Sequence, residues 1–177
     1  LIVGLGNPGA RYAGIRHNMG FLIVDALAQR AGVEINRERF DALLGRGEIS
    51  DVPAILAKPL TFMNLSGRSV AQIARYFDIG AEDILVVHDD MDFPVGDVRI
   101  KAGGGAGGHK GLLSIIDQLG GADFARVRVG IGRPPESGTA ERYVLERFSE
   151  EEKQMLDSAV ERSGDAVIAV VSSGVHA

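Results

Sequence analysis

Short apolar runs alternate along the chain with segments of helical periodicity. The first run, residues 1–5, is too short for a helix and leads directly into Gly6-Asn-Pro-Gly9, which predicts a buried strand that ends in a tight turn. Residues 84–89 are apolar up to His88, as expected of a central parallel strand. Polar side chains therefore follow two predicted buried strands, and α/β proteins place their chemistry at such strand ends.

Other stretches have the patterns of paired or half-exposed strands. Residues 41–49 and 52–57 are rich in apolar side chains and flank Ser50-Asp51, which predicts two strands joined by a turn. Residues 97–102 and 126–131 alternate basic and apolar side chains. We expect the basic face of the first of these two strands to point outward.

Four segments carry the spacing of apolar residues that favours an amphipathic helix. Asn18 and Asn64 are candidate caps at the start of the first two. Ser149 and Glu152 have the spacing of a capping box and are expected to begin the last one. The predicted helical segments extend from Asn18 to Gly32, over 65–77, over 112–119 and from Ser149 to Val171.

The alternation of strands and helices, without an internal repeat, predicts a single α/β domain over residues 1–177. Its central sheet is expected to be mixed, mostly parallel and twisted, with helices on its flanks. Because Leu1 is not a methionine and already lies in a predicted strand, we expect a few residues to precede it. The abrupt end at His176-Ala177 suggests that some residues follow as well.

Composition narrows the chemistry. The chain has no cysteine, which excludes disulfides, thiolate zinc sites and a cysteine nucleophile. No apolar run approaches the roughly 20 residues of a membrane span, and we expect no signal peptide before the first strand. We therefore expect a soluble, cytoplasmic protein that has no membrane partner.

The net charge of −5 is unevenly distributed. Residues 99–133 carry six basic side chains and two acidic ones, which leaves the rest of the chain at −9. A local basic surface on an acidic protein suits a nucleic acid that is bound briefly and released, because phosphate contacts supply most of the affinity. A solvated surface of mixed charge explains the same composition, and charge alone favours this alternative.

The segment Gly4-Leu-Gly-Asn-Pro-Gly9 fits the glycine pattern of dinucleotide-binding sites. In those sites a helix begins at the glycines, so that its N-terminus faces the pyrophosphate. Here Pro8, Gly9 and Gly14 keep the chain irregular until about Asn18. Nucleotide binding is therefore an alternative that rests on the glycine pattern alone.

Four motifs follow one another along most of the chain. They are Gly4-Leu-Gly-Asn-Pro-Gly9 with Arg16-His-Asn18, Thr61-Phe-Met-Asn-Leu-Ser-Gly67, Val87-His-Asp89 followed by Asp92, and Gly103-Gly-Gly-Ala-Gly-Gly-His-Lys-Gly111 with Arg126-Val-Arg-Val-Gly-Ile-Gly132. In this order they resemble the motifs of the bacterial-type peptidyl-tRNA hydrolases. The resemblance implies an enzyme that hydrolyses the ester between a peptide and the 3′-terminal ribose of a tRNA, without a metal or another cofactor, and frees the tRNA for translation.

For this reaction we expect a general base and a polarised carbonyl. His17 is the expected base, since an imidazole of ordinary pKa near 6.5 accepts a proton from water at neutral pH. Asp89 is expected to accept the second ring N–H of His17 and so to fix its tautomer. The resemblance places Asn7 and Asn64 beside this pair, where their neutral amides would hydrogen-bond to the peptide end and to the attacking water.

Five further residues are expected to contact the substrate. Tyr12 resembles the family's aromatic residue near the catalytic histidine, although an anchoring role within its loop explains it equally well. Lys101 and Arg128 match positions at which the family carries basic tRNA-contacting residues, and Arg99 lies two residues from Lys101 on the same strand face. Lys110 stands where the family usually has a substrate-binding asparagine, so we expect retained activity with altered affinity.

The acidic residues Asp89, Asp90 and Asp92 also raise the question of a metal. Magnesium and calcium require several converging oxygens, and zinc usually requires histidine or thiolate ligands, so we expect no metal here. For His109, a structural hydrogen bond and a ligand contact are equally consistent with the sequence.

A non-catalytic RNA-binding protein on the same scaffold is the main functional alternative, because relatives of the family serve RNA processing without hydrolysis. The presence of Asn7, His17, Asn64 and Asp89 favours the enzyme. We expect peptidyl-tRNA as the partner, and a monomer that has no obligate protein partner.

Overall fold

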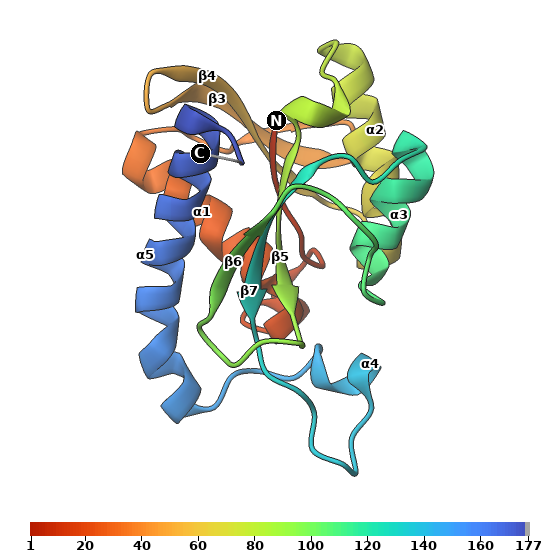
Figure 1. Cartoon of the computed structure of the whole chain (residues 1–177), viewed down its shortest axis with the longest axis vertical. Helices are drawn as coiled ribbons and strands as arrows, with labels where there is room; N and C mark the ends of the chain where they lie inside the picture. The colour runs from red at the N-terminus through yellow and green to blue at the C-terminus, as the bar shows by residue number, and fades with distance from the viewer. Residues whose placement is uncertain (176–177) are drawn as a thin grey trace.

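A twisted sheet of seven strands runs through the structure, a computed structural model that describes residues 1–175 (Figure 1). The strands are β1 (Ile2–Gly4), β2 (Arg37–Arg39), β3 (Ala42–Ile49), β4 (Val52–Pro59), β5 (Leu85–Asp90), β6 (Val98–Lys101) and β7 (Ala125–Gly130). Their order is β2-β3-β4-β1-β5-β7-β6. The four central strands are parallel, whereas β2, β3 and β6 pair in antiparallel fashion, so the predicted α/β fold with a mixed sheet is confirmed.

Helices cover both faces of this sheet (Figure 1). On one face lie α1 (Met19–Ala31) and α5 (Glu150–Ser173), and on the other lie α2 (Ser66–Tyr76) and α3 (Lys110–Leu119). The short helix α4 (Ala140–Tyr143) lies beyond one end of the sheet (Figure 1). The 3₁₀ turns within residues 1–175 are η1 (Ala10–Tyr12), η2 (Arg16–Asn18), η3 (Met63–Leu65) and η4 (Ala81–Asp83).

Strand β5 is buried on both of its faces. Leu85 and Val87 belong to the core beneath α1 and α5, whereas Val86 belongs to the core beneath α2 and α3. This explains the uninterrupted apolar run that predicted a central parallel strand. Asp89 is therefore held near the end of a rigid central strand.

Two glycines let α1 approach the sheet closely. A Cβ atom on Gly4 would lie 2.3 Å from the carbonyl oxygen of Gly20, and a Cβ atom on Gly20 would lie 2.3 Å from the backbone nitrogen of Leu5. Neither position has room for a side chain. Gly4 of the first motif thus serves close packing, and because α1 begins only at Met19, the N-terminus of this helix does not lie at the motif's glycines, as dinucleotide binding would require.

The predicted elements are present with ends shifted by a few residues. Ser50 and Asp51 both have positive φ in the β3–β4 turn, and Ser149 forms the predicted capping box with Glu152. Asn18 is at the expected N-cap position of α1 but makes no side-chain capping bond, whereas Asn64 lies within η3 and Leu65 is the N-cap of α2. Strand β2 and helix α4 were not predicted, because three- and four-residue elements leave little periodicity.

Candidate active site

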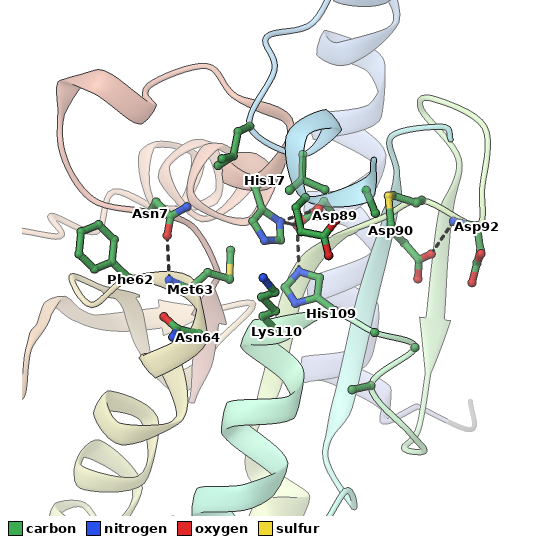
Figure 2. Close-up of a pocket in the computed structure, with 18 of the residues that line it drawn as sticks. Asn7, His17, Phe62, Met63, Asn64, Asp89, Asp90, Asp92, His109 and Lys110 are labelled. Carbon is green, nitrogen blue, oxygen red and sulfur yellow. Dashed lines mark hydrogen bonds and ion pairs between the residues drawn. The ribbon is translucent and has the colours of Figure 1, made fainter. Parts of the chain in front are cut away.

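A cavity of about 410 Å³ opens at the carboxyl ends of β1, β4 and β5, where an α/β sheet is expected to bind its ligands. Its wall also includes the end of the glycine-rich loop 103–108 and part of α4 (Figure 2). The cavity therefore gathers segments from most of the chain. Six of the predicted site residues line it: Asn7, Tyr12, His17, Asn64, Asp89 and Lys110.

Asp89 contacts two histidines, His17 and His109, in the wall of this cavity (Figure 2). Nδ1 of His17 is 2.9 Å from Oδ1 and 2.8 Å from Oδ2 of Asp89, so the expected contact is present. Nε2 of His109 is 3.0 Å from the same Oδ1. The carboxylate is buried, so both imidazoles meet it away from solvent.

The hydrogen bonds of His109 determine which of its nitrogens carries the proton. Its Nδ1 accepts the backbone N–H groups of Gly111, at 3.1 Å, and Leu112, at 3.3 Å, and thereby caps α3. The proton must then be on Nε2, which donates to Asp89. Of the two roles that the sequence left open for His109, the structure supplies the structural hydrogen bond.

The environment of Asp89 keeps it ionised. Burial alone would raise the pKa of Asp89, but attraction and hydrogen bonds from His17 and His109 outweigh burial and hold this pKa well below its usual range. As a carboxylate, Asp89 has only acceptor oxygens, so the nitrogen of His17 that faces it carries a proton. This leaves Nε2 of His17 as the free acceptor of that ring.

The same three side chains have donor atoms that could hold a metal, all within 4.8 Å of one another. A metal on Nε2 of His109 would require the ring proton at Nδ1, which could then no longer accept the N–H groups that begin α3. The observed bonds therefore favour a hydrogen-bonded cluster over a metal centre.

Asn7 is held from several directions. Its Oδ1 accepts the backbone N–H of Met63 at 2.8 Å, which directs Nδ2 away from that contact (Figure 2). Its own N–H donates to Oδ1 of Asn18 at 2.8 Å, and Nδ2 of Asn18 donates to the carbonyls of Asn7 and Tyr12, both at 3.0 Å. Asn18, the N-cap residue of α1, thus also fixes the loop that carries Asn7, a role that the sequence did not predict.

Asn64 and Lys110 come from the α2 and α3 side of the cavity. Asn64 lies in η3 and is exposed, and Lys110 is the first residue of α3. Figure 2 shows the lysine side chain rising from α3 into the space beside Met63 and His109. Lys110 is the one lysine or arginine that lines the cavity within residues 1–175, and no hydrogen bond or ion pair involves its ammonium among these residues.

Tyr12 lies at the rim of the cavity, opposite an aromatic residue that the sequence did not single out. The rings of Tyr12 and Phe62 meet edge to face, with centroids 6.4 Å apart. Phe62 is 58% exposed and Tyr12 is half-buried. Together they present an apolar surface that suits a base or a peptide side chain.

Arg99, Lys101 and Arg128 lie outside the cavity, on β6 and β7. Arg99 is directly opposite Arg128 in the pairing of these strands. Both guanidinium groups stack on Phe93, with their Cζ atoms 4.4 Å (Arg99) and 4.6 Å (Arg128) from the ring centroid. Arg128 also donates to Asp90, which lines the cavity, at 2.8 Å. The three residues thus form a basic strip that reaches the cavity edge, although Asp90 offsets part of its charge.

Arg126 does not belong to this strip, contrary to the basic surface inferred for residues 99–133. It is 1% exposed, and its guanidinium donates to the carbonyls of Gly104 and Gly105. The glycine-rich loop lies over this part of β7 and covers the side chain. Strand alternation also predicts a buried side chain for Ile100, which is instead 42% exposed at the sheet edge.

Known proteins resemble this chain along its whole length. A model of the family described as peptidyl-tRNA hydrolase matches residues 1–177. A peptidyl-tRNA hydrolase of Caldanaerobacter subterraneus subsp. tengcongensis is 48% identical over 176 residues, which cover 99% of this chain and 95% of that relative. The chloroplastic peptidyl-tRNA hydrolase of Arabidopsis thaliana is 49% identical over 177 residues, covering 99% of this chain and 62% of that protein.

Solved structures agree with these relatives. The crystal structure of peptidyl-tRNA hydrolase from Acinetobacter baumannii superposes with a TM-score of 0.90 and 39% sequence identity. The match covers 98% of this chain and 88% of that one.

Proposed function

Because the chain belongs to the peptidyl-tRNA hydrolase family, and so hydrolyses the ester between peptide and tRNA in peptidyl-tRNA, we propose that His17 is its general base. The observation that carries this proposal is the contact of His17 Nδ1 with the buried carboxylate of Asp89. This contact leaves Nε2 of His17 free to take a proton from water as the water attacks the ester carbonyl.

Asp89 has two roles in this mechanism. It holds His17 in the tautomer that has its lone pair on Nε2, and its negative charge stabilises the imidazolium that forms when the water is deprotonated. The imidazolium can then return the proton to the 3′-oxygen of the ribose as the ester bond breaks. An ester has a better leaving group than an amide, so this sequence needs neither a covalent intermediate nor a Lewis acid.

Asn7 and Asn64 are proposed to bind the peptide end and the attacking water. Because Oδ1 of Asn7 is occupied by the N–H of Met63, Nδ2 is the group that Asn7 can offer to a carbonyl oxygen or to its developing negative charge. Asn64, exposed on η3, can both donate to and accept from the peptide amide. A site that bonds this amide would discriminate against free aminoacyl-tRNA, which lacks it.

The tRNA is proposed to lie from the cavity mouth across the basic strip. Tyr12 would stack on the terminal nucleotide or on the peptide, and Lys110 would add a charge-assisted bond to a phosphate or carbonyl. Arg99, Lys101 and Arg128 would contact phosphates, which suits an enzyme that must accept every tRNA sequence.

We expect the protein to act as a monomer, without an obligate protein partner, in the compartment where translation takes place. Within residues 1–175 no helix is both long enough and apolar enough to cross a membrane.

The test is release of labelled peptide from an N-acetylated aminoacyl-tRNA by the wild-type protein and by His17→Ala, with excess EDTA and with binding of the same tRNA measured in parallel. Hydrolysis by the wild type that survives EDTA, and a loss of about 100-fold or more in a folded His17→Ala that still binds tRNA, would support the metal-free histidine mechanism. Salt-sensitive tRNA binding without hydrolysis by the wild type would favour a non-catalytic RNA-binding protein instead.

A further inference from the structure

The turn that carries His17 is attached to a segment near the other end of the chain. Backbone hydrogen bonds join residues 15–17 to residues 144–147, which lie between α4 and α5. The N–H of Arg16 donates to the carbonyl of Glu146 at 2.9 Å, within an isolated antiparallel bridge between Ile15 and Arg147, and the N–H of His17 donates to the carbonyl of Val144 at 2.9 Å.

The side chain of Arg16 strengthens this attachment. Its guanidinium lies 4.3 Å from the ring centroid of Tyr143 and 4.9 Å from that of Phe148, the residues that flank the attached segment. It then reaches Glu152 on α5, to which it donates two hydrogen bonds, at 2.8 and 2.9 Å. Such bidentate pairing fixes both the position and the orientation of an arginine side chain.

Glu152 is itself held by the start of α5. Its Oε2 accepts the backbone N–H of Ser149 at 2.7 Å, and its backbone N–H donates to the hydroxyl of Ser149 at 3.2 Å. Burial would raise the pKa of Glu152, but the hydrogen bonds from Arg16 and Ser149 lower it, so Glu152 is a carboxylate at neutral pH. Arg16 is 6% exposed, and its guanidinium is therefore paired with a fixed opposite charge.

Neither member of this pair lines the cavity. Arg16 is nevertheless the residue immediately before His17, and both belong to η2. The imidazole is thus held by Asp89 at its ring, while its backbone is held by the 144–147 segment and by the ion pair to α5. Loss of the second attachment would let the ring move relative to Asp89 and to the attacked carbonyl.

We propose that Arg16 and Glu152 are positioning residues, whose ion pair holds the catalytic turn so that His17 meets Asp89 and the water in reactive geometry. This inference rests on the proposed role of His17 as the base. A displacement of about 1 Å in a catalytic group can cost about 100-fold in rate, so the pair should act on kcat and leave substrate affinity unchanged.

Two conservative substitutions test the pair. Glu152→Gln keeps an oxygen for the N–H of Ser149 but removes the charge. Arg16→Lys keeps the charge but cannot make a bidentate hydrogen bond to the carboxylate. We expect each to lower kcat by about 10- to 100-fold while KM changes less than about 2-fold. The matched control is Asp165→Asn, which removes the charge from the exposed pair of Asp165 on α5 with Arg30 on α1, 2.7 Å apart, and should leave kcat unchanged.

A double variant separates positioning from stability. Arg16→Met with Glu152→Gln removes both charges and keeps an oxygen for the N–H of Ser149, which should restore the melting temperature that a single unpaired charge lowers. We expect kcat to stay low in this folded variant, and the NMR signal of the Nδ1–H proton of His17 to shift or broaden. Wild-type kcat and an unchanged His17 signal in the double variant, or wild-type kcat in a folded single variant, would overturn the inference.

The outcomes also distinguish this inference from the proposal on which it rests. A folded His17→Ala with wild-type activity would remove the role of His17 itself. An inactive His17→Ala beside fully active variants of Arg16 and Glu152 would remove only the positioning role.

Discussion

Asp89 contacts Nδ1 of His17 with both of its carboxylate oxygens, at 2.9 and 2.8 Å. The two residues are 72 positions apart in the chain, one in the turn after β1 and the other near the end of β5. Because His109 donates to the same carboxylate, Asp89 has a fixed orientation before any substrate binds. The fold therefore fixes, before substrate binds, the orientation of the His17 Nε2 lone pair that would accept the proton of water.

Asp89→Asn should lower kcat on the order of 1,000-fold, with a much smaller change in KM. The amide could donate to His17 Nδ1 and so favour the tautomer that has its proton on Nε2, which cannot act as a base. Steady-state hydrolysis of an N-acetylated aminoacyl-tRNA, together with thermal unfolding, checks this. A folded variant within about 10-fold of the wild-type kcat would mean that Asp89 does not orient the base.

Asn7→Asp should lower hydrolysis by about 100- to 1,000-fold without loss of the fold. One carboxylate oxygen can still accept the N–H of Met63, which is 2.8 Å from Oδ1 of Asn7. The other would replace a donor that faces the cavity with a negative charge, which would repel the developing oxyanion. Comparable kcat values for the variant and the wild type would exclude Asn7 as the carbonyl donor.

Lys110→Asn should leave kcat within about 3-fold of the wild type and weaken the salt dependence of tRNA binding. If its ammonium contacts one phosphate, the slope of log Kd against log salt concentration should fall by about one. Arg75→Gln, which removes one charge near the far end of α2, serves as the control and should leave the slope unchanged. An unchanged slope in Lys110→Asn would show that this lysine contacts no phosphate.

His88 should make the protein less stable at mildly acidic pH. Burial, followed by repulsion from His109, lowers the pKa of His88 to about 3, whereas an unfolded histidine has a pKa near 6.5. Between these values the unfolded chain binds a proton that the folded chain does not, so the free energy of unfolding falls as pH falls. The slope from this residue is at most about 1.4 kcal/mol per pH unit.

Urea unfolding of the wild type and of His88→Leu at several pH values between 4 and 6.5 tests this expectation. The variant should show a shallower dependence of the free energy of unfolding on pH. This window lies above the ordinary pKa of an aspartate. Because the pKa of Asp89 is lowered in the folded protein, the stability that Asp89 contributes is lost only at pH values below the window. Parallel curves for the two proteins would mean that His88 is not the residue responsible.

The strand-end pattern and the family motifs together were enough to bring His17, Asp89 and Asn7 to one cavity. Buried parallel strands have an unmistakable apolar pattern, and their polar ends must meet at the same edge of the sheet. The role of His109 was not predictable in this way. It depends on the placement of α3, which decides that one ring nitrogen caps the helix and the other reaches Asp89.

Arg126 and Arg16 show what periodicity leaves out. Alternation along β7 predicts which face of the sheet carries Arg126. The glycine-rich loop covers that face, so Arg126 is buried and its guanidinium hydrogen-bonds to the loop. The partner of Arg16, Glu152, is 136 residues away and was visible in the sequence only as part of a helix cap. Contacts of this kind depend on tertiary packing, which local pattern does not encode.

The most direct test of the account is the single-turnover rate of ester hydrolysis at saturating N-acetylated aminoacyl-tRNA, compared for the wild type, His17→Ala and His109→Asn. The last variant keeps a side-chain oxygen that can cap α3 but lacks an imidazole. We predict that His17→Ala loses about 100-fold or more while folded and bound to tRNA, whereas His109→Asn loses less than about 10-fold. A His17→Ala rate within about 10-fold of the wild type, or a greater loss in His109→Asn, would contradict the assignment of His17 as the base.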